Sequence, residues 1–141
     1  MSAACRLCAV LLLSFAALAA SGVAQTAALT PAAAPAYEYT FTPPPQTGTP
    51  RILEVQLNSD HLHGGGPIDI RVTTTPDVVK VTTGNGSQSG ALTQSAPGIF
   101  TSEATLPHVG ADLLVKHIKL HFTATTAAGA SVSVDVPVTY K

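Results

Sequence analysis

The sequence predicts an all-β protein, with a two-sheet antiparallel sandwich over residues 51–141. Three observations support this prediction. Apolar and polar residues alternate with period two in seven short segments, as in half-buried strands. Gly and Pro punctuate the chain between these segments at spacings of about 8–14 residues, and no segment after residue 50 keeps a helical period for three turns.

The predicted strands lie, in chain order, around residues 53–57, 68–73, 79–82, 91–94, 99–106, 117–124 and 132–140. Corners between them are expected at the three glycines 64–66, at Pro76-Asp77, in the loop 84–90 and at Gly129. The alternation places one apolar set inside, to which the aromatic residues Phe100 and Tyr140 are added. That set is Leu53, Val55, Leu57, Ile68, Ile70, Val72, Val79, Val81, Ile118, Leu120, Phe122, Val132, Val134 and Val136.

Residues 1–24 are predicted to be a signal peptide. Arg6 precedes an apolar run over residues 7–20, which is too short to span a bilayer needing about 20 apolar residues. Small residues at positions 22 and 24 suit a signal peptidase, so cleavage is expected near Ala24-Gln25. We therefore expect a secreted or periplasmic protein that does not insert in the membrane after cleavage.

The composition of the remaining chain excludes several classes of function. Both cysteines, Cys5 and Cys8, lie in the predicted signal peptide, so the mature chain can form no disulfide and no thiolate metal site. Six Lys or Arg against eight Asp or Glu give it a formal net charge of −2 once Arg6 is removed. This balance, with no basic cluster, argues against a nucleic-acid partner.

Residues 25–50 are predicted to be a flexible linker, because Pro, Ala and Thr dominate them. Within this linker, residues 37–42 alternate aromatic and polar side chains. Two interpretations remain open for them. The rings of Tyr37, Tyr39 and Phe41 pack on their own domain or form a short edge strand, or the segment is offered to the sheet edge of a partner.

With the elements in place, residues 50–141 resemble a bacterial immunoglobulin-like (Ig-like) domain of the secreted, cysteine-free kind. The resemblance is carried by the opening "PRILEVQL" strand, the glycines before the second strand and the "TPDVVKV" corner. It is also carried by the "LP" after the fifth strand and by the closing "ATTAAG…VPV" hairpin. It implies a seven-stranded Ig-like β-sandwich with a structural, adhesion or protein-binding role and no shared catalytic residues.

The stretch "DHLHGGGP", residues 60–67, is the most chemically suggestive in the chain. If it is extended, His61 and His63 project the same way about 7 Å apart, and with Asp60 they could hold copper or zinc. The competing interpretation is a glycine turn between two strands. His117 and His121 are about 13 Å apart along one strand, too far for one ion, and His108 falls in a loop.

We expect no enzyme and no cofactor. The loop "GNGSQSG" does not match the G-x-S-x-G turn of a serine nucleophile, and the carboxylates are scattered. The alternative function is a periplasmic metal-binding protein that uses His61 and His63. No phosphate-binding loop is present in the sequence.

The closing strand is the predicted partner-binding edge. It carries only one charge, Asp135, and one proline, Pro137, so it is weakly protected against pairing with another strand. A partner strand is expected to add at Ser131 and Ser133. The aromatic segment Tyr37–Phe41, from the same molecule or from a second copy, is the nearest candidate, and the competing interpretation is a disordered tail beside a solvated edge.

Overall fold

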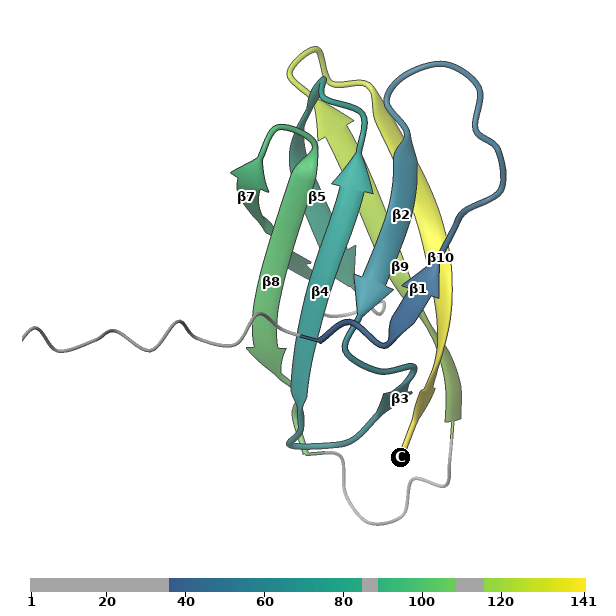
Figure 1. Cartoon of the computed structure of the whole chain (residues 1–141), viewed down its shortest axis with the longest axis vertical. Coiled ribbons are helices and arrows are strands. Elements are labelled where there is room, and N and C mark those ends of the chain that lie inside the picture. The colour runs from purple at the N-terminus through teal and green to yellow at the C-terminus, as the bar shows by residue number, and fades with distance from the viewer. Residues whose placement is uncertain (1–35, 85–88, 109–115) are drawn as a thin grey trace, which may run out of the picture. The chain divides into compact units, whose positions relative to one another are not determined.

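The computed structural model of the chain describes residues 36–84, 89–108 and 116–141. Within these ranges every regular secondary-structure element is a β-strand, so the all-β prediction is confirmed (Figure 1). These ranges include no helix long and apolar enough to cross a membrane. The predicted signal peptide, residues 1–24, lies outside the described residues.

The strands form two five-stranded sheets, here called sheet I and sheet II. Sheet I has, in spatial order, β1 (Tyr39–Phe41), β2 (Ile52–Leu57), β4 (Pro67–Thr74), β8 (Ile99–Thr105) and β7 (Thr93–Ala96). Sheet II has β3 (His61–Leu62), β10 (Ser131–Tyr140), β9 (Lys116–Thr126), β5 (Val78–Gly84) and β6 (Ser89–Ala91). All neighbouring strands are antiparallel except β3 and β10, which are parallel.

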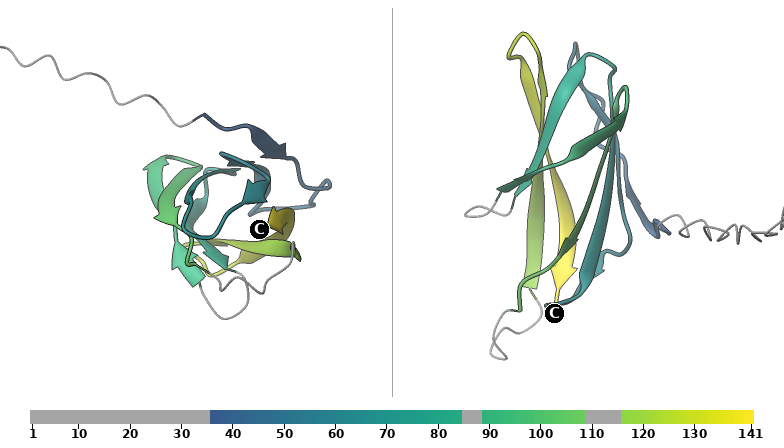
Figure 2. Two further views of the ribbon diagram at one scale, coloured as in Figure 1. Left: turned by 90° about the horizontal axis from the view of Figure 1, so that it is seen from below. Right: turned by 90° about the vertical axis from the view of Figure 1, so that its left-hand side faces the viewer.

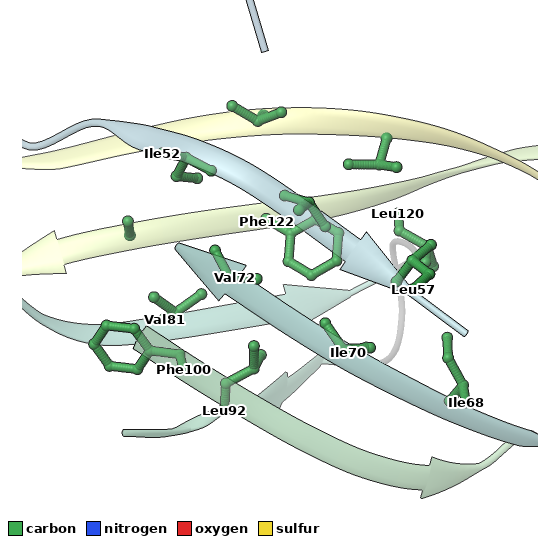
Figure 3. Close-up of a cluster of buried hydrophobic side chains, with 14 of the residues drawn as sticks. Ile52, Leu57, Ile68, Ile70, Val72, Val81, Leu92, Phe100, Leu120 and Phe122 are labelled. Carbon is green, nitrogen blue, oxygen red and sulfur yellow. The ribbon is translucent and has the colours of Figure 1, made fainter. Parts of the chain in front are cut away.

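The two sheets pack face to face around one apolar core (Figure 2). Phe100 of β8 and Phe122 of β9 are its two largest fully buried side chains, one from each sheet. Figure 3 shows these rings among the aliphatic side chains of β2, β4 and β5. The core is held by burial of apolar surface, at roughly 25 cal/mol per Å².

Ten strands replace the predicted seven, for three reasons. Residues 39–41 of the predicted linker form β1, and His61–Leu62 of the predicted turn forms β3. The predicted weak strand near residues 91–94 is divided into β6 and β7, because the chain passes there from sheet II to sheet I. Leu92 lies at the crossing, buried, and its N–H donates to the Val81 carbonyl at 2.9 Å.

Two predicted core residues, Leu53 and Val79, are exposed, by 43% and 53%. A register irregularity lies at each position, between Ile52 and Glu54 in β2 and between Val78 and Lys80 in β5. A bulge sets two residues opposite one and interrupts the strict alternation. Ile52 and Val78, the residues before them, are therefore buried instead.

Twelve of the fourteen predicted core residues do lie in or against the core, although Ile118 and Val132 are only partly buried. Phe100 is buried and Tyr140 is partly buried, as expected. The core also includes residues that the alternation did not assign to it. These are Ile52, Leu62, Val78, Leu92, Ala124 and Val138.

The described part of the chain before β2, residues 36–51, is held against sheet I rather than being a linker throughout. The rest of the predicted linker, residues 25–35, lies outside the described residues. β1 pairs with β2 in the register Tyr39–Leu57 and Phe41–Val55. Where β1 no longer reaches, the side-chain oxygen of Gln46 accepts a hydrogen bond from the N–H of Ile52 at 3.0 Å. The edge of β2 is therefore covered by backbone pairing at one end and by a side-chain amide at the other.

The bulge in β5 predicts opposite outcomes for two adjacent valines. Val78→Ala should lower the free energy of unfolding by about 2 kcal/mol, because it removes two buried methyl groups and leaves a cavity. Val79→Ala should change it by no more than about 0.5 kcal/mol, because Val79 is exposed. Urea denaturation of the two variants measures both values, and a larger loss for Val79→Ala would contradict the bulge.

Candidate functional site

Asp60, His61 and His63 surround a short parallel pairing at the end of sheet II. His61 pairs with Thr139 and Leu62 with Tyr140. Leu62 is buried, whereas His61 and His63 on either side of it are exposed. The carboxylate Oδ1 of Asp60 lies 3.8 Å from His61 Nε2, and both side chains are about half exposed.

The structure does not assemble these three residues into a metal-ligand group. Across the described ranges, no three His, Cys, Asp or Glu side chains lie close enough together to hold one ion. Asp60 instead faces a depression that it shares with His117, and the Nδ1 of His117 lies 3.4 Å from the Thr139 hydroxyl. The described residues therefore give the metal interpretation no complete ligand set.

The glycines after His63 form the turn that leads into β4. The N–H of Gly66 donates to the His63 carbonyl at 3.0 Å, and Gly65 has a φ of 76°, in the left-handed region that favours glycine. The turn is tied to the end of β8, since Gly65 N–H donates to Leu106 O and Leu106 N–H donates to Gly66 O, each at 2.9 Å. The turn interpretation of "HGGGP" describes this geometry.

His108, which the sequence left unplaced, packs against this turn. A side-chain Cβ at Gly65 would fall on the His108 imidazole ring. The absence of a side chain at Gly65 therefore serves two purposes, because it permits the positive φ and leaves room for the ring. Nearby, the Tyr140 hydroxyl donates to the Pro107 carbonyl at 2.8 Å and closes the same end of the fold.

His121 and Asp135 form a cross-strand pair on the outer face of sheet II. They lie opposite each other in β9 and β10, and His121 Nδ1 donates to the Asp135 carboxylate at 2.7 Å. This hydrogen bond lowers the pKa of Asp135 below its ordinary 3.8; desolvation opposes the shift, and the charges of His121 and Lys119 add to it.

The aromatic segment forms an edge strand on its own domain, which is one of the two interpretations expected for it, and within this chain it does not dock on the closing strand. Docking of this segment from a second copy stays a prediction. β1 pairs with β2 in sheet I, not with Ser131–Val134 of β10. Tyr39 nevertheless reaches β10, because its hydroxyl donates to the Pro137 carbonyl at 3.4 Å. Tyr39 and Phe41, the two end residues of β1, are partly buried and pack against the core.

The closing strand is at an edge over most of its length. Its partners among the described strands are β9 along all ten residues and β3 at Thr139 and Tyr140. Ser131 is exposed, and the Ser133 hydroxyl is 2.9 Å from that of Thr123 in β9. Binding of a partner strand at Ser131 and Ser133 stays a prediction.

Tyr37 takes part in a different site, which the sequence did not predict. Before β1 the chain lies over sheet I, in front of β4 in Figure 1, and Tyr37 forms one wall of a groove on the outer face of that sheet. The groove has a volume of about 450 Å³ and is called here the Tyr37 groove. Its lining residues are Tyr37, Arg71, Ser95, Ile99, Thr101, Ser102 and Glu103.

Strand register explains why these side chains meet. Arg71 of β4 lies opposite Thr101 of β8, and Asp69 lies opposite Glu103 two pairs further along, on the same face of the sheet. Burial raises the pKa of the Tyr37 phenol above its ordinary 10.0; the Arg71 charge opposes this shift, and the charges of Asp69 and Glu103 add to it. The phenol therefore stays protonated at neutral pH, as a hydrogen-bond donor and acceptor.

The sequence contained only a faint indication of this groove. Arg71 is a charged residue in the middle of an apolar-alternating strand, which by itself marks an outward position. Tyr37 lies more than thirty positions earlier, in a segment predicted to be a linker. Only the path of that segment across sheet I brings the two together.

Substitution of Gly65 should show both reasons why glycine is needed there, the positive φ and the room for the His108 ring. Gly65→Ala is expected to lower the free energy of unfolding by about 1–2 kcal/mol for the left-handed backbone alone, with a further loss from the clash with His108. His108→Ala in the same background should recover the second part only. Urea denaturation of the two single variants and the double variant gives this coupling, and strictly additive losses would contradict the contact.

The His121–Asp135 pair predicts a dependence of stability on pH. Because the pKa of Asp135 is lowered in the folded state, its contribution is fully present above its unfolded pKa of about 3.9 and is lost as pH falls through the folded value. Asp135→Asn should thus reduce the urea midpoint at pH 6 and have progressively less effect below pH 4. Added salt should weaken the difference, since the pair is exposed.

The matched control for this pair is Glu54→Gln, which removes a carboxylate from sheet I that makes no salt bridge within the described ranges. Its urea midpoint should follow that of the unmodified protein at each pH more closely than Asp135→Asn does. An effect of Asp135→Asn that is equal at pH 6 and pH 2.5 would contradict the assignment.

Comparison of the chain with protein-family models, with curated proteins and with solved structures finds no match. The functional argument therefore depends on the geometry of this chain, and the Tyr37 groove is the site at which that geometry gathers the most varied polar groups.

Proposed function

We propose that this protein is a secreted or periplasmic Ig-like module that binds a ligand without chemical turnover. The strand order supports the Ig-like part of the proposal. Without β1, sheet I runs β2-β4-β8-β7 and sheet II runs β10-β9-β5 with β6 beside it. When the strands of these two sheets are lettered in chain order, the orders correspond to the A-B-E-D and G-F-C arrangements of an Ig-like sandwich.

The first strand of such a sandwich is divided here between the two sheets. β2 belongs to sheet I, and β3 follows it into sheet II, where it pairs in parallel with β10. Arrows of β2 and β10 point the same way in Figure 1, so the chain changes sheets without reversing direction. This accounts for one parallel pair in an otherwise antiparallel fold.

The predicted signal peptide supports the location, and the absence of cysteine after residue 24 means that the sandwich needs no oxidative folding step. Removal of residues 1–24 would leave the domain with the Tyr37 segment attached. The groove depends on that segment, because Tyr37 supplies one of its walls.

The Tyr37 groove is the observation that carries the binding role. It gathers a guanidinium, a carboxylate, a phenol and the hydroxyls of Ser95 and Thr101 from residue 37, β4, β7 and β8, over the aliphatic surface of Ile99. Its volume of about 450 Å³ falls within the range of about 300–1,000 Å³ typical of small-ligand sites. An open groove on a sheet face suits reversible recognition of a surface component, as in adhesion.

The test is a titration followed residue by residue. Isotope-labelled protein is titrated with short peptides and soluble oligosaccharides, and backbone amide shifts are recorded. Binding should shift the amides of Arg71, Thr101 and Glu103 and leave Lys80 and Thr125, on the outer face of sheet II, unchanged. Recovery of the ligands unaltered after prolonged incubation is expected for a module without turnover.

Two results would contradict the proposal. One is that no ligand of either class shifts the groove amides at millimolar concentration, and the other is that a ligand bound in the groove is recovered as a new product.

A further inference from the structure

The floor of the Tyr37 groove offers side chains rather than backbone. The groove lies over the face of sheet I, where the N–H and C=O groups of β4 and β8 are paired with each other in a continuous register. An extended peptide gains most when it adds its backbone to a free sheet edge. The floor between β4 and β8 offers no such pairing, so a ligand that lies on it is held there through side-chain groups.

Those side chains provide donors and acceptors in similar measure. Arg71 presents a planar fork of N–H donors that can engage two adjacent oxygens. Glu103 offers carboxylate acceptors, and Thr101, which lies opposite Arg71 and on the same strand as Glu103, adds a hydroxyl. Ser95 donates its hydroxyl hydrogen to the Ile99 carbonyl at 3.3 Å, which leaves its oxygen lone pairs for a ligand donor.

The charges of this face offer no unopposed partner to an ionic ligand of either sign. Asp69 and Glu103 are directly opposite each other, so an anion near Arg71 also meets two carboxylates. A cation drawn to those carboxylates meets the Arg71 guanidinium, which makes no salt bridge in the described part of the chain. A neutral ligand with many hydroxyl groups avoids both penalties and can use every polar group.

Apolar atoms make up most of the lining surface of the groove. Tyr37 and Ile99 are both among the lining residues, and burial raises the pKa of the Tyr37 phenol. An aromatic side chain with a polar tip can pack its ring on apolar C–H groups while its hydroxyl forms hydrogen bonds. A sugar ring carries both kinds of group, with C–H groups on its faces and hydroxyls at its rim.

From this arrangement we infer that the Tyr37 groove binds a neutral saccharide, packed on Tyr37 and Ile99 and held by Arg71 and Glu103. The inference rests on the proposed binding function and adds the class of ligand. It also assigns a role to the segment before β1, because Tyr37 is the aromatic residue among those that line the groove.

The test uses isothermal titration calorimetry and amide-shift mapping with named probes. These are neutral tetrasaccharides of glucose, galactose, mannose and N-acetylglucosamine, and, as the competing class, a neutral octapeptide of alternating Ser and Gly. At least one tetrasaccharide should bind and shift the groove amides. Arg71→Ala should weaken that binding by about tenfold or more, the effect of losing a hydrogen bond to a charged group.

Matched variants separate the contributions. Arg71→Lys keeps the charge and loses the fork, so it should bind more weakly than the unmodified protein. Tyr37→Phe keeps the ring and loses the hydroxyl, whereas Tyr37→Ala loses both and should bind more weakly still. Lys80→Ala removes an exposed cation from sheet II and should leave the affinity unchanged. All these positions are on outer faces or in the tail, and circular dichroism checks that each variant is folded.

The outcomes distinguish this inference from the function on which it rests. Groove shifts with the octapeptide but with none of the saccharides would overturn the inference and leave the binding function in place. No groove shifts with either class would overturn both. Saccharide binding that Arg71→Ala and Tyr37→Ala leave unchanged would place the saccharide elsewhere and overturn the inference.

Discussion

The packing of two sheets against each other is the interaction on which the rest of this structure depends. Phe100 and Phe122 approach from opposite sheets, and the valines, leucines and isoleucines of β2, β4, β5, β9 and β10 fill the space around them. No disulfide can reinforce this packing, because no cysteine follows residue 8. Stability must therefore come from close apolar packing and from complete pairing of the strands.

Such a fold exposes the edges of both sheets, and the chain covers them with short pieces. Each sheet ends in strands of only two to four residues, which are poor templates for further pairing. β1 and Gln46 cover the outer edge of β2, while β3, Pro137 and the Tyr39 hydroxyl limit the exposed edge of β10. The same tail segment therefore protects an edge and forms one wall of the groove.

Local departures from ideal strands decide which surfaces are available. The bulge in β5 turns Val79 outward and Val78 inward, and the turn at Gly65 brings β8 and His108 against the beginning of β4. Within the regular part of β4 and β8, uninterrupted register places Arg71, Thr101 and Glu103 on one outer face. The groove is thus a consequence of regular pairing together with the path of the tail.

Period-two alternation determined the all-β class, the approximate positions of the main strands and most of the core, because burial of one strand face requires apolar residues at every second position. It also indicated that His117 and His121 lie too far apart along one strand to hold one metal ion. It could not place Leu53 or Val79 correctly, because a bulge is set by pairing with a neighbouring strand and leaves little trace in the sequence of the bulged strand itself. It could not find β1, because a three-residue edge strand is stabilised by its partner.

For the candidate sites the division is similar. Local sequence was enough to suggest a glycine turn after His63, because the φ values of a tight turn are a property of its own residues. Whether His108 packs on Gly65 and whether Tyr37 lies near Arg71 depend on distances between segments remote in the chain. Those distances are fixed only when the two sheets close on their core, and for that reason the tertiary structure alone decided the site.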